Sequence, residues 1–220
     1  QRQMCIRDRN YPKPFLYALM NLMGSHDRPR ILNVLAGNDG SDIPRSQRAG
    51  HRLSQEERMI GALREQLMLR FIFSVPGMPC IYYGDEAGME GCADPFCRRT
   101  YPWGHEDAQM LARYQAMTAM RNAHPVLRTG ECVYLAPCAD VLGVIRKNES
   151  GRDAFGSQAE NACAVTLINR SAKEVVVYLT AEDVCGAKTL VTDDGQTLSA
   201  RGGAFSVKVK GLQGMTGFAE

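Results

Sequence analysis

The sequence has no long uninterrupted apolar segment and no excess of charge of one sign. Its longest apolar stretch, residues 67–83, is interrupted by Arg70, Ser74 and Pro76, so it predicts no membrane-spanning helix. The 26 Lys and Arg residues are interspersed with 24 Asp and Glu residues, which leaves a net charge of +2. This balance gives no electrostatic reason for binding nucleic acid or an anionic membrane.

The sequence also lacks metal-ligand spacing, although it contains 8 cysteines. None of them forms a C-x-x-C pair or has a histidine at ligand distance, so neither a metal site nor another cofactor is predicted. Cys80 and Cys163 lie in or beside apolar segments and are expected to be small buried side chains. Scattered thiols favour a reducing cytoplasm. Cys92 and Cys97 are the candidates for a disulfide if the protein is exported.

The first half of the chain has the order expected of a β/α unit in a parallel barrel. Residues 16–23 are a candidate strand, and residues 31–52 are expected to be a loop with at most one helical turn. Ser54-Gln55-Glu56-Glu57 is a capping box, and apolar residues at helical spacing then predict a helix over 55–73. Residues 78–83 form an apolar run bounded by Gly and Pro, which suits a second, buried strand.

The second half changes character after a further helix, predicted over 106–122 and ended by His124-Pro125. From Cys132 onward the hydrophobic period becomes two, which is typical of half-buried antiparallel strands. We therefore predict an antiparallel β-sandwich. Its strands are expected at 141–146, 164–169, 175–179, 189–191 and 205–209, with a hairpin loop at 148–161 and a tight turn at Asp194-Gly195.

Two segments carry side chains suited to a polar substrate. His26-Asp27 follows the first candidate strand, where a solvated surface turn is the simpler interpretation. A long irregular loop after residue 86 carries Asp94, Arg98, Arg99 and Trp103, the only tryptophan of the chain. Carboxylates and guanidinium groups hydrogen-bond sugar hydroxyls, and an indole ring stacks on sugar faces. A loop with an internal Asp-Arg ion pair is the alternative for this second segment.

Taken together, these segments resemble the alpha-amylase family of glycoside hydrolases, within it the neopullulanase, maltogenic amylase and cyclomaltodextrinase group. The resemblance is carried by N-L-M-G-S-H-D-R-P-R at 21–30, G-M-P-C-I-Y-Y-G-D-E-A-G-M-E-G at 77–91 and D-P-F-C-R-R at 94–99. It implies an eight-fold β/α barrel followed by a β-sandwich domain. Such a barrel alone needs roughly 250 residues, so the chain is expected to be a C-terminal fragment whose nucleophile and acid/base lie upstream.

The implied domains are the last part of the barrel at 10–125 and the sandwich at 126–220. Residues 1–9 fit nothing that follows and are expected to be a non-native leader.

The resemblance also implies roles for individual residues. Asp27 matches the carboxylate that stabilises the transition state, and His26 matches the adjacent histidine that contacts the same sugar. Asp94 and Arg98 match a pair that binds the next glucose, although they could instead only brace each other. Arg30 is expected to anchor its loop rather than to touch substrate. The strand end at 82–86 is expected to be architectural, with its two tyrosines in the core.

The function implied is that of a retaining alpha-glucan hydrolase acting on starch, pullulan or cyclodextrin, with this segment alone inactive. A non-catalytic relative that keeps the fold as a scaffold or a carbohydrate-binding protein is the alternative from another class, and a transglycosylase is the alternative among enzymes. An alpha-glucan is the expected partner. The complete enzyme could bind calcium or form a homodimer, but no calcium site is evident in this sequence.

Overall fold

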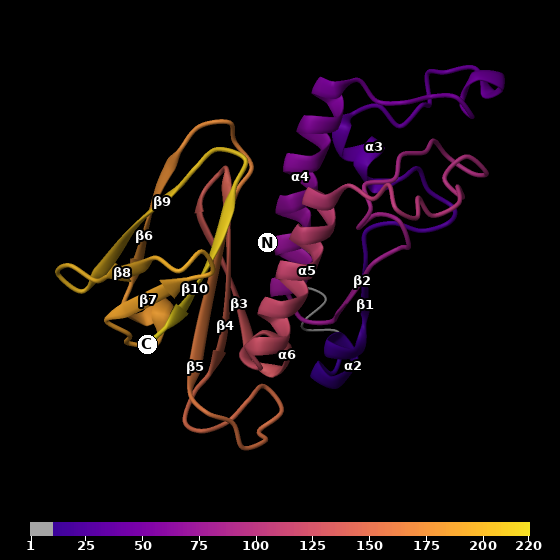
Figure 1. Cartoon of the computed structure of the whole chain (residues 1–220). Coiled ribbons are helices and arrows are strands. Elements are labelled where there is room, and N and C mark those ends of the chain that lie inside the picture. Colours follow the sequence, from indigo (N-terminus) through magenta and orange to yellow (C-terminus); the bar gives the residue numbers. More distant parts are fainter. Residues whose placement is uncertain (1–10) are drawn as a thin grey trace. The chain divides into compact units, whose positions relative to one another are not determined.

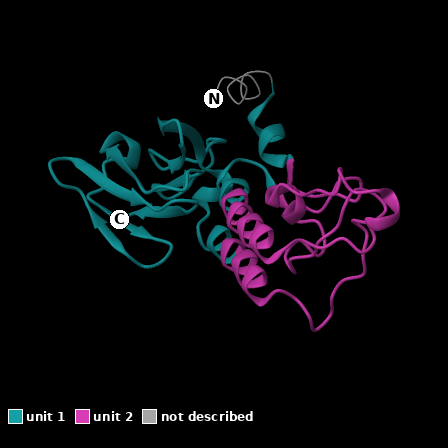
Figure 2. Ribbon diagram, turned by 90° about the horizontal axis from the view of Figure 1, so that it is seen from above, with its two compact units in different colours: residues 1–19, 70–78, 119–220 teal, residues 20–69, 79–118 magenta. Residues whose placement is uncertain are grey.

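The computed structural model describes residues 11–220, which form two compact units (Figure 2). The first, called the sheet unit below, comprises residues 11–19, 70–78 and 119–220. The second, called the loop unit, comprises residues 20–69 and 79–118. Residues 1–9, predicted to be a leader, lie outside the described residues. The proposed domain boundary at 125/126 stays a prediction.

The sheet unit contains eight strands in two antiparallel sheets (Figure 1). Six strands pair in the order β3-β4-β5-β10-β7-β8, and β6 pairs with β9 in a second sheet. The bounds are β3 Glu131–Cys138, β4 Val141–Asn148, β5 Ala162–Asn169, β6 Val175–Thr180, β7 Thr189–Thr192, β8 Thr197–Ser199, β9 Ala204–Val209 and β10 Gly214–Ala219.

The core of this unit lies between the two sheets. Alternation along β9 buries Phe205, Val207 and Val209 while the intervening residues face outward. They pack with Leu167 of β5 and Leu179 of β6 in one hydrophobic cluster. Each fully buried side chain of this size contributes roughly 1.5–3 kcal/mol to stability. The predicted antiparallel β-sandwich is therefore confirmed.

Polar groups attach helical segments to the other face of the six-stranded sheet. Arg146 of β4 is fully buried and donates to the carbonyl oxygens of Ser74 (2.9 Å) and Leu127 (2.7 Å). Ser74 Oγ also lies 2.9 Å from Thr166 Oγ1 of β5. These contacts join the sheet to the end of α4 (Gln55–Ser74) and to α6 (Val126–Thr129), a short helix that the sequence did not predict.

The two long predicted helices are present. The Ser54 amide donates to Glu57 Oε2 (2.7 Å) and the Glu57 amide to Ser54 Oγ (3.2 Å), so the capping box before α4 is confirmed. The second helix is α5 (Ala108–Ala123), which begins two residues later than predicted. It starts there because Asp107 Oδ1 accepts the amides of residues 109 and 110 and caps the helix.

Three predictions about the first half were wrong in part. The candidate strand at 16–23 is split between a helix, α2 (Lys13–Ala18), and a short strand, β1 (Met20–Leu22). Two prolines, at the N-cap and in the first turn, favour the helix start. The predicted loop at 31–52 opens with α3 (Ile31–Ala36), which buries its first three residues, and also contains η1 (Arg45–Gln47). The second strand, β2 (Met78–Cys80), ends three residues early.

The turns of the sandwich follow the sequence signals. Residues 149–161 connect β4 to β5, which pair as an antiparallel hairpin. Asp194-Gly195 joins β7 to β8, with Gly195 at φ +82°, a conformation that glycine adopts without strain. Over residues 11–220, none of the helices combines the length and the apolar character that a membrane span requires.

Candidate functional site

The His26-Asp27 turn lies in the loop unit, shortly after β1. The turn is closed locally, because the Asp27 amide donates to Ser25 Oγ (3.3 Å). His26 Nε2 lies 3.2 Å from Asp27 Oδ1, and both side chains are more than 60% exposed. The imidazole and the carboxylate are therefore held next to each other and remain accessible to a ligand.

Arg98 joins this turn to the second predicted segment. Its Nε donates to Asp94 Oδ1 (2.8 Å) and to the backbone carbonyl of His26 (3.2 Å). Its Nη2 lies 3.6 Å from Asp27 Oδ1. The structure thus brings all four predicted site residues together. They form two pairs in the sequence, and the two pairs are about 70 positions apart. We call His26, Asp27, Asp94 and Arg98 the sugar-contact cluster, after the role that the resemblance implies for them.

The ion pairs of the cluster are exposed and contribute little to stability. Exposed ion pairs of this kind contribute about 0–1 kcal/mol each, because water and salt compete for both partners. The ion pair between Asp94 and Arg98 is therefore present, but it contributes little to the stability of the loop. Two carboxylates share one guanidinium, which leaves acceptor oxygens on Asp27 and Asp94 for hydroxyl donors.

Buried Arg30 fixes the backbone beneath the cluster. Its amide donates to the Gly91 carbonyl (2.8 Å), and its Nε donates to the Cys97 carbonyl (2.8 Å). Its Nη1 donates to the Tyr83 carbonyl and lies 3.1 Å from Asp85 Oδ1. Arg30 therefore links the turn before α3 to the two loop segments that follow β2. The expectation that it anchors its loop is confirmed.

Close backbone approaches complete this anchor. A Cβ at position 91 would lie 2.6 Å from the Phe96 carbonyl oxygen, so only glycine fits there. The Cys97 thiol lies 3.1 Å from the His26 carbonyl oxygen, to which Arg98 also donates. The loop at 91–98 is thereby held against the His26-Asp27 turn by backbone contacts as well as by the exposed side chains.

Asp85 is the buried partner of Arg30. Burial raises the pKa of the Asp85 carboxyl to about 6, and the charge of Arg30 opposes this rise. Its second oxygen has no hydrogen-bond partner among the described residues. Glu86, by contrast, accepts the Gly84 amide at 2.8 Å and does not pair with its neighbour. The architectural role expected for this strand end fits these contacts.

The tyrosines of the strand end depart from expectation. Tyr83 is 42% exposed instead of lying in the core, and its hydroxyl donates to the Arg99 carbonyl (2.8 Å). The strand ends at residue 80, so the two rings are not buried by a sheet and stack against the Arg30 guanidinium instead, at 4.5 and 4.6 Å. Trp103 is 79% exposed, with its ring centroid 4.5 Å from that of Tyr101.

The cysteines and possible metal ligands add no further centre within residues 11–220. The seven cysteines of this range are all free, including Cys92 and Cys97, which are buried. Cys163 is buried as expected, whereas Cys80 is only half-buried. In the same range, no group of three or more His, Cys, Asp or Glu side chains is placed to hold a metal ion.

Comparison with known proteins finds several relatives of this chain. An amylopullulanase of Thermoanaerobacter thermohydrosulfuricus is 36% identical over 215 residues, which are 97% of this chain and 14% of the relative. A cyclomaltodextrinase of Geobacillus thermopakistaniensis (strain MAS1) is 30% identical over 164 residues, which are 74% of this chain and 22% of the relative. No protein-family model matches the chain.

Solved structures agree with the sequence relatives. An alpha-amylase of Geobacillus thermoleovorans, complexed with acarbose, superposes with a TM-score of 0.76 over 100% of this chain and 42% of that one, at 17% identity. This likeness, together with the sandwich, shows that the chain shares the fold of that alpha-amylase. The chain belongs to the alpha-amylase family. It spans less than a quarter of the length of the two sequence relatives, 14% and 22%.

Proposed function

We propose that the chain is the C-terminal part of a retaining alpha-glucan hydrolase and that Asp27 is its transition-state-stabilising carboxylate. The observation that carries the proposal is the sugar-contact cluster, in which Arg98 joins Asp94 to the His26-Asp27 turn. Two segments distant in the sequence would have no need to meet in this way at an exposed surface if each were only a solvated loop.

The proposed chemistry follows from the acceptor groups of the cluster. Retaining glycosidases cleave through an oxocarbenium-like transition state with one carboxylate as nucleophile and another as acid/base. Asp27 would accept hydrogen bonds from hydroxyls of the distorted sugar, and these bonds would strengthen as positive charge develops on the ring. His26 would donate to the same sugar. Asp94 and Arg98 would hold the neighbouring glucose.

The nucleophile and the acid/base would come from earlier strands of a β/α barrel, of which residues 10–125 would form the last part. The chain alone would then hydrolyse nothing. Alpha-glucans are the proposed substrates, since two relatives are named amylopullulanase and cyclomaltodextrinase and a structural neighbour was solved with acarbose. The scaffold alternative has less support, because a scaffold needs no exposed carboxylates held beside an imidazole and a guanidinium.

The test is the substitution Asp27→Asn in the complete enzyme, assayed on maltodextrin. We expect kcat to fall on the order of 10³-fold, since loss of one interaction that stabilises a developing charge costs about 10²–10³-fold or more. The matched control is Asp42→Asn, an exposed aspartate of the same unit outside the cluster. Near-normal kcat in Asp27→Asn would remove Asp27 from this role.

A further inference from the structure

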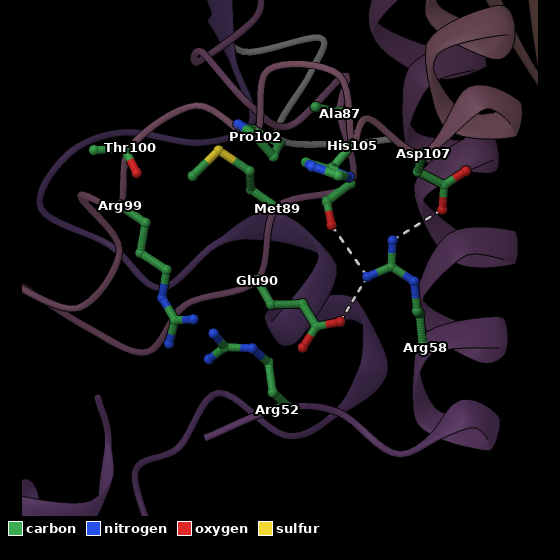
Figure 3. Close-up of a pocket in the computed structure, with 11 residues that line it drawn as sticks. Arg52, Arg58, Ala87, Met89, Glu90, Arg99, Thr100, Pro102, His105 and Asp107 are labelled. Atoms are coloured by element: carbon green, nitrogen blue, oxygen red, sulfur yellow. Dashed lines mark hydrogen bonds and ion pairs between the residues drawn. The ribbon is translucent and has the colours of Figure 1, made fainter. Parts of the chain in front are cut away.

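A pocket of about 530 Å³ lies in the loop unit and is formed by residues that the sugar-contact cluster does not use (Figure 3). Its charged and polar lining consists chiefly of Arg52, Arg58, Arg99, Glu90, Asp107 and His105. Three guanidinium groups and two carboxylates face this pocket. Some of these charges are already paired with each other inside the protein.

Arg58 and backbone amides contact both oxygens of each carboxylate. Arg58 lies 2.6 Å from Glu90 Oε1 and 2.8 Å from Asp107 Oδ2. The remaining oxygens are occupied as well, because Glu90 Oε2 accepts the Leu53 amide (2.9 Å) and Asp107 Oδ1 caps α5. Each oxygen of both acids therefore already accepts at least one hydrogen bond.

Arg52 and Arg99 are left without an acidic partner. Arg52 donates to the His51 carbonyl (2.7 Å), and Arg99 donates to the carbonyls of Ala49 (2.9 Å) and Phe96 (3.3 Å). Arg99 Nη2 also donates to the His51 carbonyl, at 3.4 Å. Within residues 11–220 neither guanidinium is within ion-pair distance of a carboxylate. Burial lowers the pKa of Arg99 and the positive charge of Arg52 lowers it further, whereas the charge of Glu90 opposes this shift. Figure 3 shows the two guanidinium groups pointing toward each other.

Two like charges beside one pocket repel each other, and an anion placed between them would relieve that repulsion. The planar donor fork of arginine matches the oxygens of a phosphate group in a bidentate geometry. The exposed His105 imidazole stands at the same pocket as a further donor. The charged groups of this lining that form no ion pair are therefore donors, which favours an oxyanion over a neutral sugar.

We propose that this pocket binds a phosphate group through Arg52 and Arg99, supplied either as free orthophosphate or as an ester on a glucose unit. The ester form rests on the proposed function. Arg98 and Arg99 are consecutive, so Arg98 would contact a glucan while Arg99 contacts the phosphate on one of its glucose units. The free form is independent of that function.

The experiment is titration calorimetry of the purified chain with inorganic phosphate, glucose 6-phosphate and glucose, at constant ionic strength because exposed charges are screened by salt. The variants are Arg52→Met, Arg99→Met and, as the matched control, Arg64→Met. Arg64 is an exposed arginine of the same unit that also donates to a backbone carbonyl, that of Leu35, but does not line the pocket. Circular dichroism checks that each variant folds.

We expect saturable binding of both phosphates but not of glucose, weakened about tenfold or more by Arg52→Met and Arg99→Met and unchanged by Arg64→Met. Tighter binding of glucose 6-phosphate than of phosphate would identify the ester as the source, and equal or weaker binding would identify the free anion. Arg52→Met is decisive if Arg99→Met does not fold, since Arg52 is exposed. Absence of saturable phosphate binding, or binding that Arg52→Met leaves unchanged, would overturn the proposal. Neither result would bear on the role proposed for Asp27.

Discussion

Replacing Arg30 by Met should destabilise the loop unit and loosen the turn that carries Asp27. The substitution keeps an apolar stem of similar length but removes the donors to the Cys97 and Tyr83 carbonyls and the partner of Asp85. Both members of this ion pair are almost completely buried. Breaking a buried pair by removing one partner costs about 3–5 kcal/mol, because the other charge stays buried without compensation. We expect a loss of that size at neutral pH.

The loss should depend on pH in a direction set by Asp85. Its folded pKa, raised to about 6, lies above the unfolded value of about 3.9. The stability that protonated Asp85 contributes is therefore complete below about pH 4 and is lost as the pH rises through 6. Removing Arg30 raises the folded pKa further, which extends this loss to higher pH. The difference between wild type and Arg30→Met should be smallest near pH 4 and largest near pH 8.

The assay is urea unfolding followed by circular dichroism at 222 nm, at several pH values. Arg30→Met combined with Asp85→Asn should recover part of the lost free energy at pH 8, since it removes the stranded charge. Arg64→Met, the exposed control, should change the free energy of unfolding by about 0.5 kcal/mol or less. A loss below about 1 kcal/mol in Arg30→Met, or no recovery in the double variant, would refute the view that this pair holds the site.

Three further predictions concern the stability of the chain and the exposed ring of Trp103. Glu65→Gln should stabilise the chain by about 3 kcal/mol at pH 7 but not at pH 4. Burial raises the pKa of Glu65 to about 8, so this carboxylate must take up a proton when the chain folds at pH 7. Gln carries no charge and keeps the acceptor oxygen for the Tyr114 hydroxyl. Thermal unfolding at the two pH values tests this, and equal shifts at both would contradict it. Ser54→Ala should cost about 1 kcal/mol in urea unfolding, because one amide at the start of α4 loses its cap; no measurable change would show that the cap is dispensable. Trp103→Ala in the complete enzyme should raise KM for maltodextrin more than it lowers kcat, since its exposed ring can supply only binding. An unchanged KM would exclude stacking of a sugar on the Trp103 ring.

The sequence predicted the sandwich and the long helices best where one strong local pattern decided the structure. The strict alternation of β9 and the capping box of α4 are two such patterns. It failed for β10, whose segment contains two glycines and has little intrinsic strand preference, although the structure places it between β5 and β7. Pairing on both sides stabilises that strand, and no local signal reports such pairing.

In the site, too, the sequence selected some residues but could not show the contacts that depend on the folded chain. The resemblance selected Asp27, His26, Asp94 and Arg98, but spacing alone could not show that Arg98 donates to the backbone of residue 26. Nor could it show that Arg30 is fully buried beneath two tyrosine rings, since its sequence neighbours read as an open turn. Nor could the sequence show that Arg52 and Arg99 form no ion pair, since this depends on the contacts of Arg58 with both carboxylates.

The most direct test of the central claim is a crystal structure of the complete enzyme with acarbose bound. The account predicts a sugar ring whose hydroxyls lie within about 3.2 Å of Asp27 and His26, with Asp94 and Arg98 on the neighbouring ring. Acarbose bound elsewhere, with Asp27 facing solvent, would contradict the assignment of this cluster to catalysis.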